Sequence, residues 1–354
     1  WNERGGGDVQ KAGPEEMMGQ IYARIHKEYK NFRLNMELSV PGQVLGVLGA
    51  SGCGKSMTLK AIAGIITPDK GKAAVGERIV YDSDRKIDLP PQKRKVGYLF
   101  QNYALFPNMT VYENIGAAAG KDKSLVKSLI RRFHLEETQG LYPDRLSGGQ
   151  QQRTALARIL ASGPEALLLD EPFSALDSYM KEELQMELKE RLQEFGGPVM
   201  IVSHDRDELY RLCDHIMVMS AGENLICKGT KELFEDPEKM EAARLTGCKN
   251  ITPAVRAGER EVEAKEWGVR FTLNRKIPER LKYIGIRAHD FRPAGADGQI
   301  RVEAVSVTDA PFERNVLFKN ADCPRGTMWM KLDGRDGQIP ERVSVQEDKI
   351  LLLE

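Results

Sequence analysis

Short apolar runs along the first two thirds of the chain predict a set of buried strands. The run at residues 43–48 is short enough for such a strand, and residues 57–64 are typical of a helix rich in Leu, Lys, Ala and Ile that ends at a glycine. Similar runs at 96–100, 166–172 and 200–203 predict three more strands. This part of the chain is therefore expected to combine buried strands with helices.

Alternation of apolar and polar residues predicts two antiparallel strands near the start of the chain. Apolar residues occupy every second position from Ile21 to Ile25 and again from Phe32 to Leu38. The connection between the two strands is expected near residues 27–31. Further along, residues 116–145 are expected to be helical, with one apolar face made of Leu125, Leu129, Phe133 and Leu135.

The pattern changes after residue 250 to short alternating stretches, which predict a small β-barrel. These stretches are 262–264, 269–271, 284–287, 302–305 and 343–345. Before them, residues 238–247 predict a short helix closed by glycine.

We therefore divide the chain by its sequence into four parts. These are a leader or tag at 1–19, a first domain at 20–237, a linker at 238–249 and a β domain at 250–354. The chain begins with tryptophan, and Met17 or Met18 would be a more natural start.

Composition narrows the class of protein. The length of 354 residues favours two domains over one core, and 52 basic residues balance 52 acidic ones, so bulk charge gives no reason to expect nucleic-acid binding. Apolar runs are shorter than the roughly 18–20 residues of a membrane span. The five cysteines are scattered without a C-x-x-C pair, which argues against a disulfide framework or zinc site and favours a reducing cytoplasm.

A glycine-rich stretch between the strand at 43–48 and the helix at 57–64 has the form G-x-x-x-x-G-K-S. Its residues are Gly49, Ala50, Ser51, Gly52, Cys53, Gly54, Lys55 and Ser56. Successive backbone N–H groups and the helix start can bind a phosphate there, Lys55 can reach the β- and γ-phosphates, and Ser56 can ligate Mg²⁺. The alternative is a glycine-rich turn without a ligand.

Polar side chains at the ends of three predicted strands extend this candidate site. The strand predicted at 166–172 ends in two adjacent carboxylates: Asp170 is expected to hold Mg²⁺ through water, and Glu171 to face the attacking water. Gln101 follows the strand at 96–100, and His204 follows the strand at 200–203, where it is expected to contact the γ-phosphate.

A second glycine-rich helix start, at residues 146–153, could also bind a phosphate. Since one nucleotide does not need two such sites from one chain, two copies arranged head to tail are expected. An aromatic residue two dozen positions before Lys55 could stack on adenine; Tyr29 is favoured over Phe32, and a core role is the alternative for either.

In their order, these motifs resemble the ATP-binding subunit of ABC transporters over roughly Gln20 to Pro237. The resemblance implies a RecA-like α/β core with an antiparallel β subdomain and a helical subdomain, and an ATP-sandwich homodimer that uses ATP and Mg²⁺. It implies Glu171 as general base and His204 as γ-phosphate switch. Its metal ligands would be Ser56, Gln101 and Asp170, and its further nucleotide-contacting residues Met57, Ser147, Gly148, Gly149, Gln150 and Asp177. Met57 departs from the family, which commonly has threonine there.

The tail from Asn250, with Gly285 to Asp290, is similar to the C-terminal domain of importer ATPases for molybdate, sulfate, maltose and iron. This similarity implies that the tail either regulates transport or only helps the chain to dimerise. Residues 90–94 and 96–114 look closest to the molybdate and sulfate members. The expected function is the energy-coupling subunit of a bacterial oxyanion importer at the cytoplasmic face of the membrane, with a permease docked on Tyr103 to Val111 and, indirectly, a solute-binding protein. Alternatives are an importer ATPase for iron, sugar or polyamine, a soluble ABC ATPase of translation or repair, or an exporter subunit.

Overall fold

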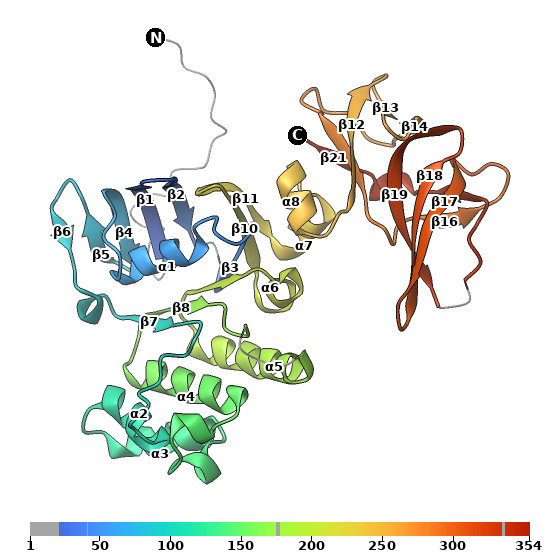
Figure 1. Cartoon of the computed structure of the whole chain (residues 1–354). Helices are drawn as coiled ribbons and strands as arrows, with labels where there is room; N and C mark the ends of the chain where they lie inside the picture. The colour runs from blue at the N-terminus through green and yellow to red at the C-terminus, as the bar shows by residue number, and fades with distance from the viewer. Residues whose placement is uncertain (1–20, 41, 175–177, 335–336) are drawn as a thin grey trace. The chain divides into compact units, whose positions relative to one another are not determined.

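The computed structural model describes residues 21–40, 42–174, 178–334 and 337–354. The chain divides into two compact units between Thr230 and Lys231 (Figure 1). The first unit holds every candidate site residue named above that the structure describes, and the second unit is the β-rich tail.

A six-stranded sheet forms the centre of the first unit, in the order β11-β10-β3-β9-β8-β7. Five strands are parallel and β11 is antiparallel to its neighbour. The strands are β3 (Val44–Leu48), β7 (Val96–Leu99), β8 (Ala166–Asp170), β9 (Val199–Ser203), β10 (His215–Ser220) and β11 (Glu223–Gly229). Because β3, β8 and β9 are buried along their whole length, they are continuous apolar runs rather than alternating ones. The buried strands predicted from these runs are confirmed.

A second, antiparallel sheet has the order β2-β1-β4-β5-β6. Its strands are β1 (Ile21–Tyr29), β2 (Phe32–Ser39), β4 (Lys70–Val75), β5 (Arg78–Asp82) and β6 (Ile87–Asp88). The predicted hairpin is confirmed, but its connection is shorter than expected. Tyr29 pairs with Phe32 across a two-residue turn, so residues 27–29 belong to the strand.

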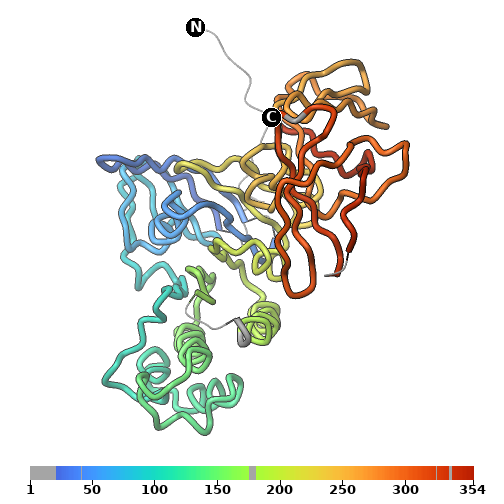
Figure 2. Tube along the Cα trace, turned by 45° about the vertical axis from the view of Figure 1, so that its right-hand side comes forward, coloured from blue at the N-terminus to red at the C-terminus, as the bar shows by residue number. Residues whose placement is uncertain are grey.

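Some helices of the first unit lie beside the central sheet, and others form a group of their own (Figures 1 and 2). The helices of the first unit are α1 (Lys55–Ala63), α2 (Val111–Ala119), α3 (Lys123–Arg132), α4 (Gly148–Ala161), α5 (Ser178–Phe195) and α6 (Arg206–Leu212). Helices α2, α3 and α4 lie together on one side of the unit, away from the antiparallel sheet, as both views show. This group corresponds to the helical subdomain that the sequence resemblance implied.

The predicted helix over residues 116–145 is wrong in its bounds. A capping box at Thr110 and Glu113 starts α2 five residues earlier, and Gly120 ends it with a positive φ of 62°. After α3 the chain turns at His134, which has φ 51°, and only short 3₁₀ turns at Glu136–Thr138 and Pro143–Arg145 follow. Phe133 and Leu135 are buried without belonging to a helix.

The described residues of the second unit are mainly β-strands, with two short α-helices, α7 (Thr230–Glu235), which begins at the boundary, and α8 (Met240–Leu245), and a 3₁₀ turn at Glu347–Lys349. One sheet has the order β14-β13-β12-β15-β21 and the other β16-β20-β17-β18-β19. The strands are β12 (Asn250–Arg256), β13 (Glu261–Ala264), β14 (Val269–Thr272), β15 (Tyr283–Ile286), β16 (Arg292–Ala294), β17 (Ile300–Asp309), β18 (Glu313–Asn320), β19 (Cys323–Asp333), β20 (Arg342–Ser344) and β21 (Leu351–Leu353). Both sheets contribute to one core, which includes Trp267, Phe271, Phe291 and Phe318. The five predicted stretches fall on β13, β14, β15, β17 and β20, with residues 287 and 345 just beyond their strands; β12, β16, β18, β19 and β21 were not anticipated. Within the described residues, no helix has the length and apolar character needed to cross a membrane.

Candidate functional site

The glycine-rich loop joins β3 to α1, as the sequence predicted, and close contacts require glycine at two of its positions, Gly49 and Gly54. Gly54 has φ 107°, and a Cβ atom there would lie 2.9 Å from the Phe32 ring. A side chain at Gly49 would collide with the carbonyl oxygen of Met219. Helix α1 begins at Lys55 without a side-chain cap, so its first N–H groups are free of a side-chain acceptor. A helix start of this kind binds anions.

Lys55 is buried within the loop, at 5% exposure. Its Nζ donates hydrogen bonds to the carbonyl oxygens of Gly49 at 2.7 Å and Ala50 at 2.9 Å. The loop thus holds the ammonium group beside the start of α1, and one of its three protons is left for an anion. The neighbouring Cys53 is also buried, and burial raises the pKa of its thiol, which disfavours the reactive thiolate.

Asp170 receives hydrogen bonds on both oxygens of its buried carboxylate. Ser56 Oγ donates to Oδ1 at 2.7 Å, and the Tyr98 hydroxyl donates to Oδ2 at 2.8 Å. The predicted proximity of Ser56 and Asp170 is thereby observed, although they lie 114 positions apart in the sequence. Tyr98 was not among the predicted site residues.

Glu171 lies next to Asp170 but meets a different set of side chains. Its backbone is in the left-handed region, with φ 47°, and its N–H donates to the Val202 carbonyl at 2.9 Å. One carboxylate oxygen accepts a hydrogen bond from Gln101 Nε2 at 3.3 Å, and the other lies 3.3 Å from His204 Nδ1. A non-glycine residue with a positive φ is strained, and such strain often marks a functional position.

The glycine-rich loop lines a pocket of about 470 Å³ together with side chains from the ends of the neighbouring strands, and we call it the Lys55 pocket. Its lining residues are Ser51, Gly52, Gly54, Lys55, Ser56, Met57, Gln101, Glu171 and His204. Among the described residues, no group of three His, Cys, Asp or Glu side chains could hold a metal by itself. The oxygen donors of Ser56, Asp170 and Gln101 suit Mg²⁺, which prefers oxygen ligands and usually takes only one or two carboxylates from the protein. The residues therefore fit a Mg²⁺ ion bound together with phosphate oxygens.

The segment around His204 is held by a buried network that sequence reasoning missed. Ser203 Oγ donates to Glu208 at 2.7 Å and accepts from the Asp205 N–H at 2.9 Å. Burial raises the pKa of Glu208, and Lys181 of α5 lies 3.4 Å from its carboxylate. The available sequence signal was Asp205 followed three positions later by Glu208, the spacing of a capping motif.

Comparisons with known proteins identify the family of this chain. A family model described as ABC transporter matches residues 32–174. A sulfate/thiosulfate import ATP-binding protein of Chromobacterium violaceum is 40% identical over 278 residues, which make up 75% of this chain and 74% of that protein. The chain belongs to the ABC transporter family.

Other members of the ABC transporter family are similar over shorter or comparable lengths. An Fe(3+) ions import ATP-binding protein of Haemophilus influenzae is 38% identical over 220 residues, or 60% of this chain, and the match spans 62% of that relative's length. A spermidine/putrescine import ATP-binding protein of Vibrio vulnificus is 34% identical over 280 residues, 74% of this chain and 72% of that protein. The dimeric post-hydrolysis structure of the ATP-binding cassette MJ0796, bound to ADP and Pi, has a TM-score of 0.51 and 27% identity, and covers 59% of this chain and 98% of that one.

The second glycine-rich motif lies at the start of α4. Ser147 accepts a hydrogen bond from the Gln150 N–H, and the Gln150 side chain accepts one from the Ser147 N–H, so the two form a capping box with Gly148 and Gly149 between them. None of these four residues is among those that line the Lys55 pocket. The predicted role of these residues in a partner's site stays a prediction. Asp177 lies outside the described residues.

The candidate adenine-stacking residues stay predictions as well. Tyr29 is 40% exposed, and the Lys27 ammonium lies 5.8 Å from its ring centroid. Phe32 is half-buried and its ring lies against Gly54 of the phosphate loop. Neither aromatic ring is among the residues lining the Lys55 pocket.

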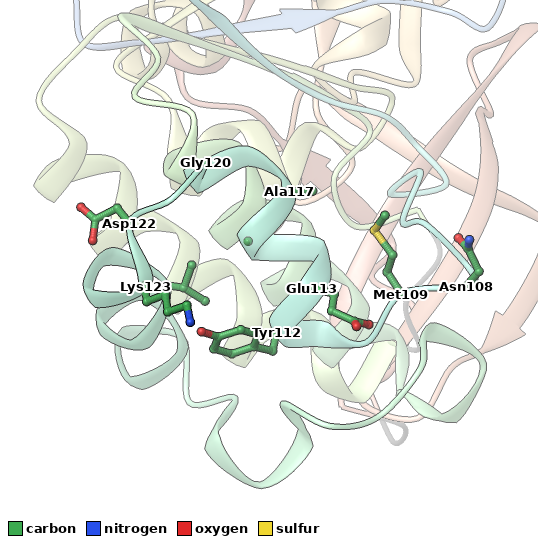
Figure 3. Close-up of a pocket in the computed structure, with 10 residues that line it drawn as sticks. Asn108, Met109, Tyr112, Glu113, Ala117, Gly120, Asp122 and Lys123 are labelled. Atoms are coloured by element: carbon green, nitrogen blue, oxygen red, sulfur yellow. The ribbon is translucent and has the colours of Figure 1, made fainter.

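The stretch expected to dock the permease is only partly exposed. Tyr103 is buried and donates to the Pro172 carbonyl at 3.2 Å, and Val111 is buried too, so these two residues do not belong to an exposed surface. Phe106 is 45% exposed. Next to this stretch is an open pocket of about 500 Å³ (Figure 3) lined by Asn108, Met109, Tyr112, Glu113, Gly116, Ala117, Gly120, Asp122, Lys123 and Val126.

Proposed function

We propose that this chain hydrolyses ATP and is the energy-coupling subunit of a bacterial ABC importer. The observation that carries the proposal is the meeting of Glu171, Gln101 and His204 in one pocket with the Lys55 loop. This arrangement offers a phosphate site and a carboxylate beside it, which is what hydrolysis of a phosphoanhydride requires.

In the proposed mechanism, the N–H groups at the start of α1 and the Lys55 ammonium bind the phosphates. Ser56, Asp170 and Gln101 would hold Mg²⁺, which supplies positive charge against the phosphate oxygens when bound. Glu171 accepts a proton from the attacking water, with Gln101 and His204 placed to orient its carboxylate. Because the Glu171 backbone is fixed by its bond to Val202, the base is positioned before substrate arrives.

We propose that the working form is a homodimer in which Ser147 of one copy completes the ATP site of the other. In support, the Ser147 motif is a helix start outside its own chain's pocket, and the MJ0796 cassette is a dimer. The test mixes a Lys55→Ala subunit with a Ser147→Arg subunit, each inactive alone. In the mixed dimer one site carries both changes and the other carries neither, so activity should return. If mixed dimers form but show no activity, either the shared-site proposal is wrong or hydrolysis needs two intact sites in each dimer.

We propose that the permease docks at the exposed face around Phe106. Asn114, fully buried, donates to the carbonyl oxygens of Phe106, Met109 and Thr110 and accepts from the Phe106 N–H, so the loop is held in one shape. Arg158 of α4 donates to the carbonyls of Tyr103 and Ala104, and its guanidinium lies 5.0 Å from the Phe106 ring centroid. A rigidly presented aromatic residue is typical of an interface anchor. The same loop thus connects a docking surface to the helix that begins with the Ser147 motif.

We propose an oxyanion such as sulfate or molybdate as the transported solute, and a peripheral location on the cytoplasmic membrane face through the permease. The sulfate/thiosulfate relative supports this choice; the iron and polyamine relatives support the alternative solutes. The deciding experiment reconstitutes the chain with its permease and solute-binding protein in vesicles and measures ATP-driven uptake of sulfate, molybdate, Fe³⁺ and spermidine. Uptake of none, together with co-purification of ribosomes instead of a membrane protein, would favour a soluble ABC ATPase.

A further inference from the structure

The unexpected contact in the ATP site is the one between Tyr98 and Asp170. Tyr98 lies on β7, directly opposite Leu168 of β8, so its side chain extends along the neighbouring strand toward the end where Asp170 lies. The Tyr98 hydroxyl donates to Asp170 Oδ2 at 2.8 Å. The ring is itself supported by Phe100, with ring centroids 4.5 Å apart.

This contact leaves the Asp170 carboxylate little freedom to turn. Tyr98 binds one oxygen and Ser56 binds the other, at 2.8 and 2.7 Å, so rotation of the carboxylate would break both hydrogen bonds. The Tyr98 hydroxyl is the donor in this pair, because an ionised carboxylate can only accept hydrogen bonds.

We propose that Tyr98 is a positioning residue that orients Asp170 for Mg²⁺. The proposal rests on the ATPase function proposed above, in which Asp170 holds the ion. Side chains that orient a metal ligand commonly contribute about 10–100-fold to metal affinity. Gln101 lies three residues after Tyr98, just beyond the end of β7, and donates to Glu171. The same segment therefore supports the metal ligand and contacts the catalytic base.

Two effects of the Tyr98 hydroxyl oppose each other. Its hydrogen bond draws charge away from Asp170, so removing it would strengthen the attraction of the carboxylate for a cation. Removing it also frees the carboxylate to rotate, which weakens metal binding. Since the metal needs a lone pair in a fixed direction, we expect orientation to be the larger effect.

The test replaces Tyr98 by Phe, which removes one oxygen and keeps the ring. The dissociation constant of ATP is measured by calorimetry with excess Mg²⁺ and again with EDTA, in hydrolysis-free conditions at low temperature. Mn²⁺ binding to the ATP complex is measured separately by its EPR signal. We expect unchanged affinity for ATP in EDTA, and an approximately 10-fold smaller gain in affinity when Mg²⁺ is added. Mn²⁺ should bind more weakly by a similar factor.

Tyr81→Phe is the matched control. Tyr81 lies on β5 of the antiparallel sheet, and its buried hydroxyl also donates at 2.8 Å, but to the Pro68 carbonyl. This variant should bind ATP and metal like the wild type. If Tyr98→Phe keeps the wild-type gain from Mg²⁺, or binds ATP more weakly with and without metal alike, the proposal for Tyr98 is overturned. If the wild-type chain itself gains nothing from Mg²⁺, the proposed ATPase site fails and the role of Tyr98 fails with it.

Discussion

Replacing Arg94 by Met should loosen the helix that carries the phosphate-binding lysine. Arg94 is completely buried below the end of α1, where Nη1 donates to the carbonyl oxygens of Ala61 at 3.0 Å and Ile62 at 2.9 Å. Its Nε donates to the Leu89 carbonyl at 2.6 Å, and its Nη2 pairs with Asp88 at 2.7 Å. Arg94 therefore joins the C-terminal end of α1 to the segment that leads into β7.

The size of the effect follows from these contacts. Met fills much of the same volume but leaves the Ile62 and Leu89 carbonyls without their donor, at a cost of about 1–3 kcal/mol each. The Asp88 carboxyl is 45% exposed, so water replaces the ion pair and its loss adds less than about 1 kcal/mol. The two carbonyls together therefore predict a loss of about 2–6 kcal/mol in the free energy of opening α1.

Hydrogen–deuterium exchange of the α1 amides, residues 55–63, measures this local opening. A change of about 3 kcal/mol corresponds to more than 100-fold faster exchange, and the affinity for ATP should fall because Lys55 moves with the helix. Arg78→Met is the matched control, since its 3.2 Å pair with Glu165 is exposed and should contribute less than about 1 kcal/mol. Equal exchange in the two variants would refute the capping role of Arg94.

Three further changes probe other parts of the molecule. Phe106→Asp should abolish coupled transport, while the isolated subunit should still bind ATP. Leu225→Asp, the control, also changes an exposed apolar residue and should leave transport intact. Transport by the Phe106 variant would point to another docking surface. Burial raises the pKa of Glu208, so its contribution to stability is largest below the pKa of the unfolded chain and is lost as pH rises through the folded value. The melting temperature of Glu208→Gln relative to wild type should therefore rise as pH increases above the ordinary Glu pKa of about 4, and a constant difference would contradict this. Residues 1–230 alone should still bind ATP, and a transporter that lacks the tail should no longer be inhibited by solute inside the vesicle or cell. If internal solute inhibits the transporter equally with and without the tail, the tail has only a structural role.

The elements that sequence reasoning predicted well are those fixed by local signals. The β3 strand, the glycine loop and α1 follow from an apolar run, from residues that need positive φ, and from Gly64 at the helix end. The helix predicted over 116–145 failed because apolar spacing continued through Leu135, although the backbone leaves the helix at His134. Burial produces the same pattern in a turn as in a helix, so periodicity could not tell them apart.

The contacts that complete the site depend on distant parts of the chain. The Tyr98–Asp170 hydrogen bond joins residues 72 positions apart, and the Ser203–Glu208–Lys181 network brings α5 to the segment after β9. Such contacts depend on strand order, since β8 lies between β7 and β9 in the sheet although helices separate the three strands along the chain. Motif spacing could therefore suggest Ser56, and strand ends could suggest Gln101, Glu171 and His204, but neither signal pointed to the residues that support them.

The central claim is that Glu171 is the base for ATP hydrolysis, and steady-state turnover of Glu171→Gln tests it most directly. Glutamine keeps the size of the side chain but cannot accept the proton, so turnover should fall about 10²–10⁴-fold. Binding of ATP should persist, because Lys55 and the start of α1 are unchanged. The control is Glu165→Gln, an exposed carboxylate paired only at the surface with Arg78, which should keep wild-type turnover. Near-normal turnover by Glu171→Gln, with bound ATP, would contradict the mechanism.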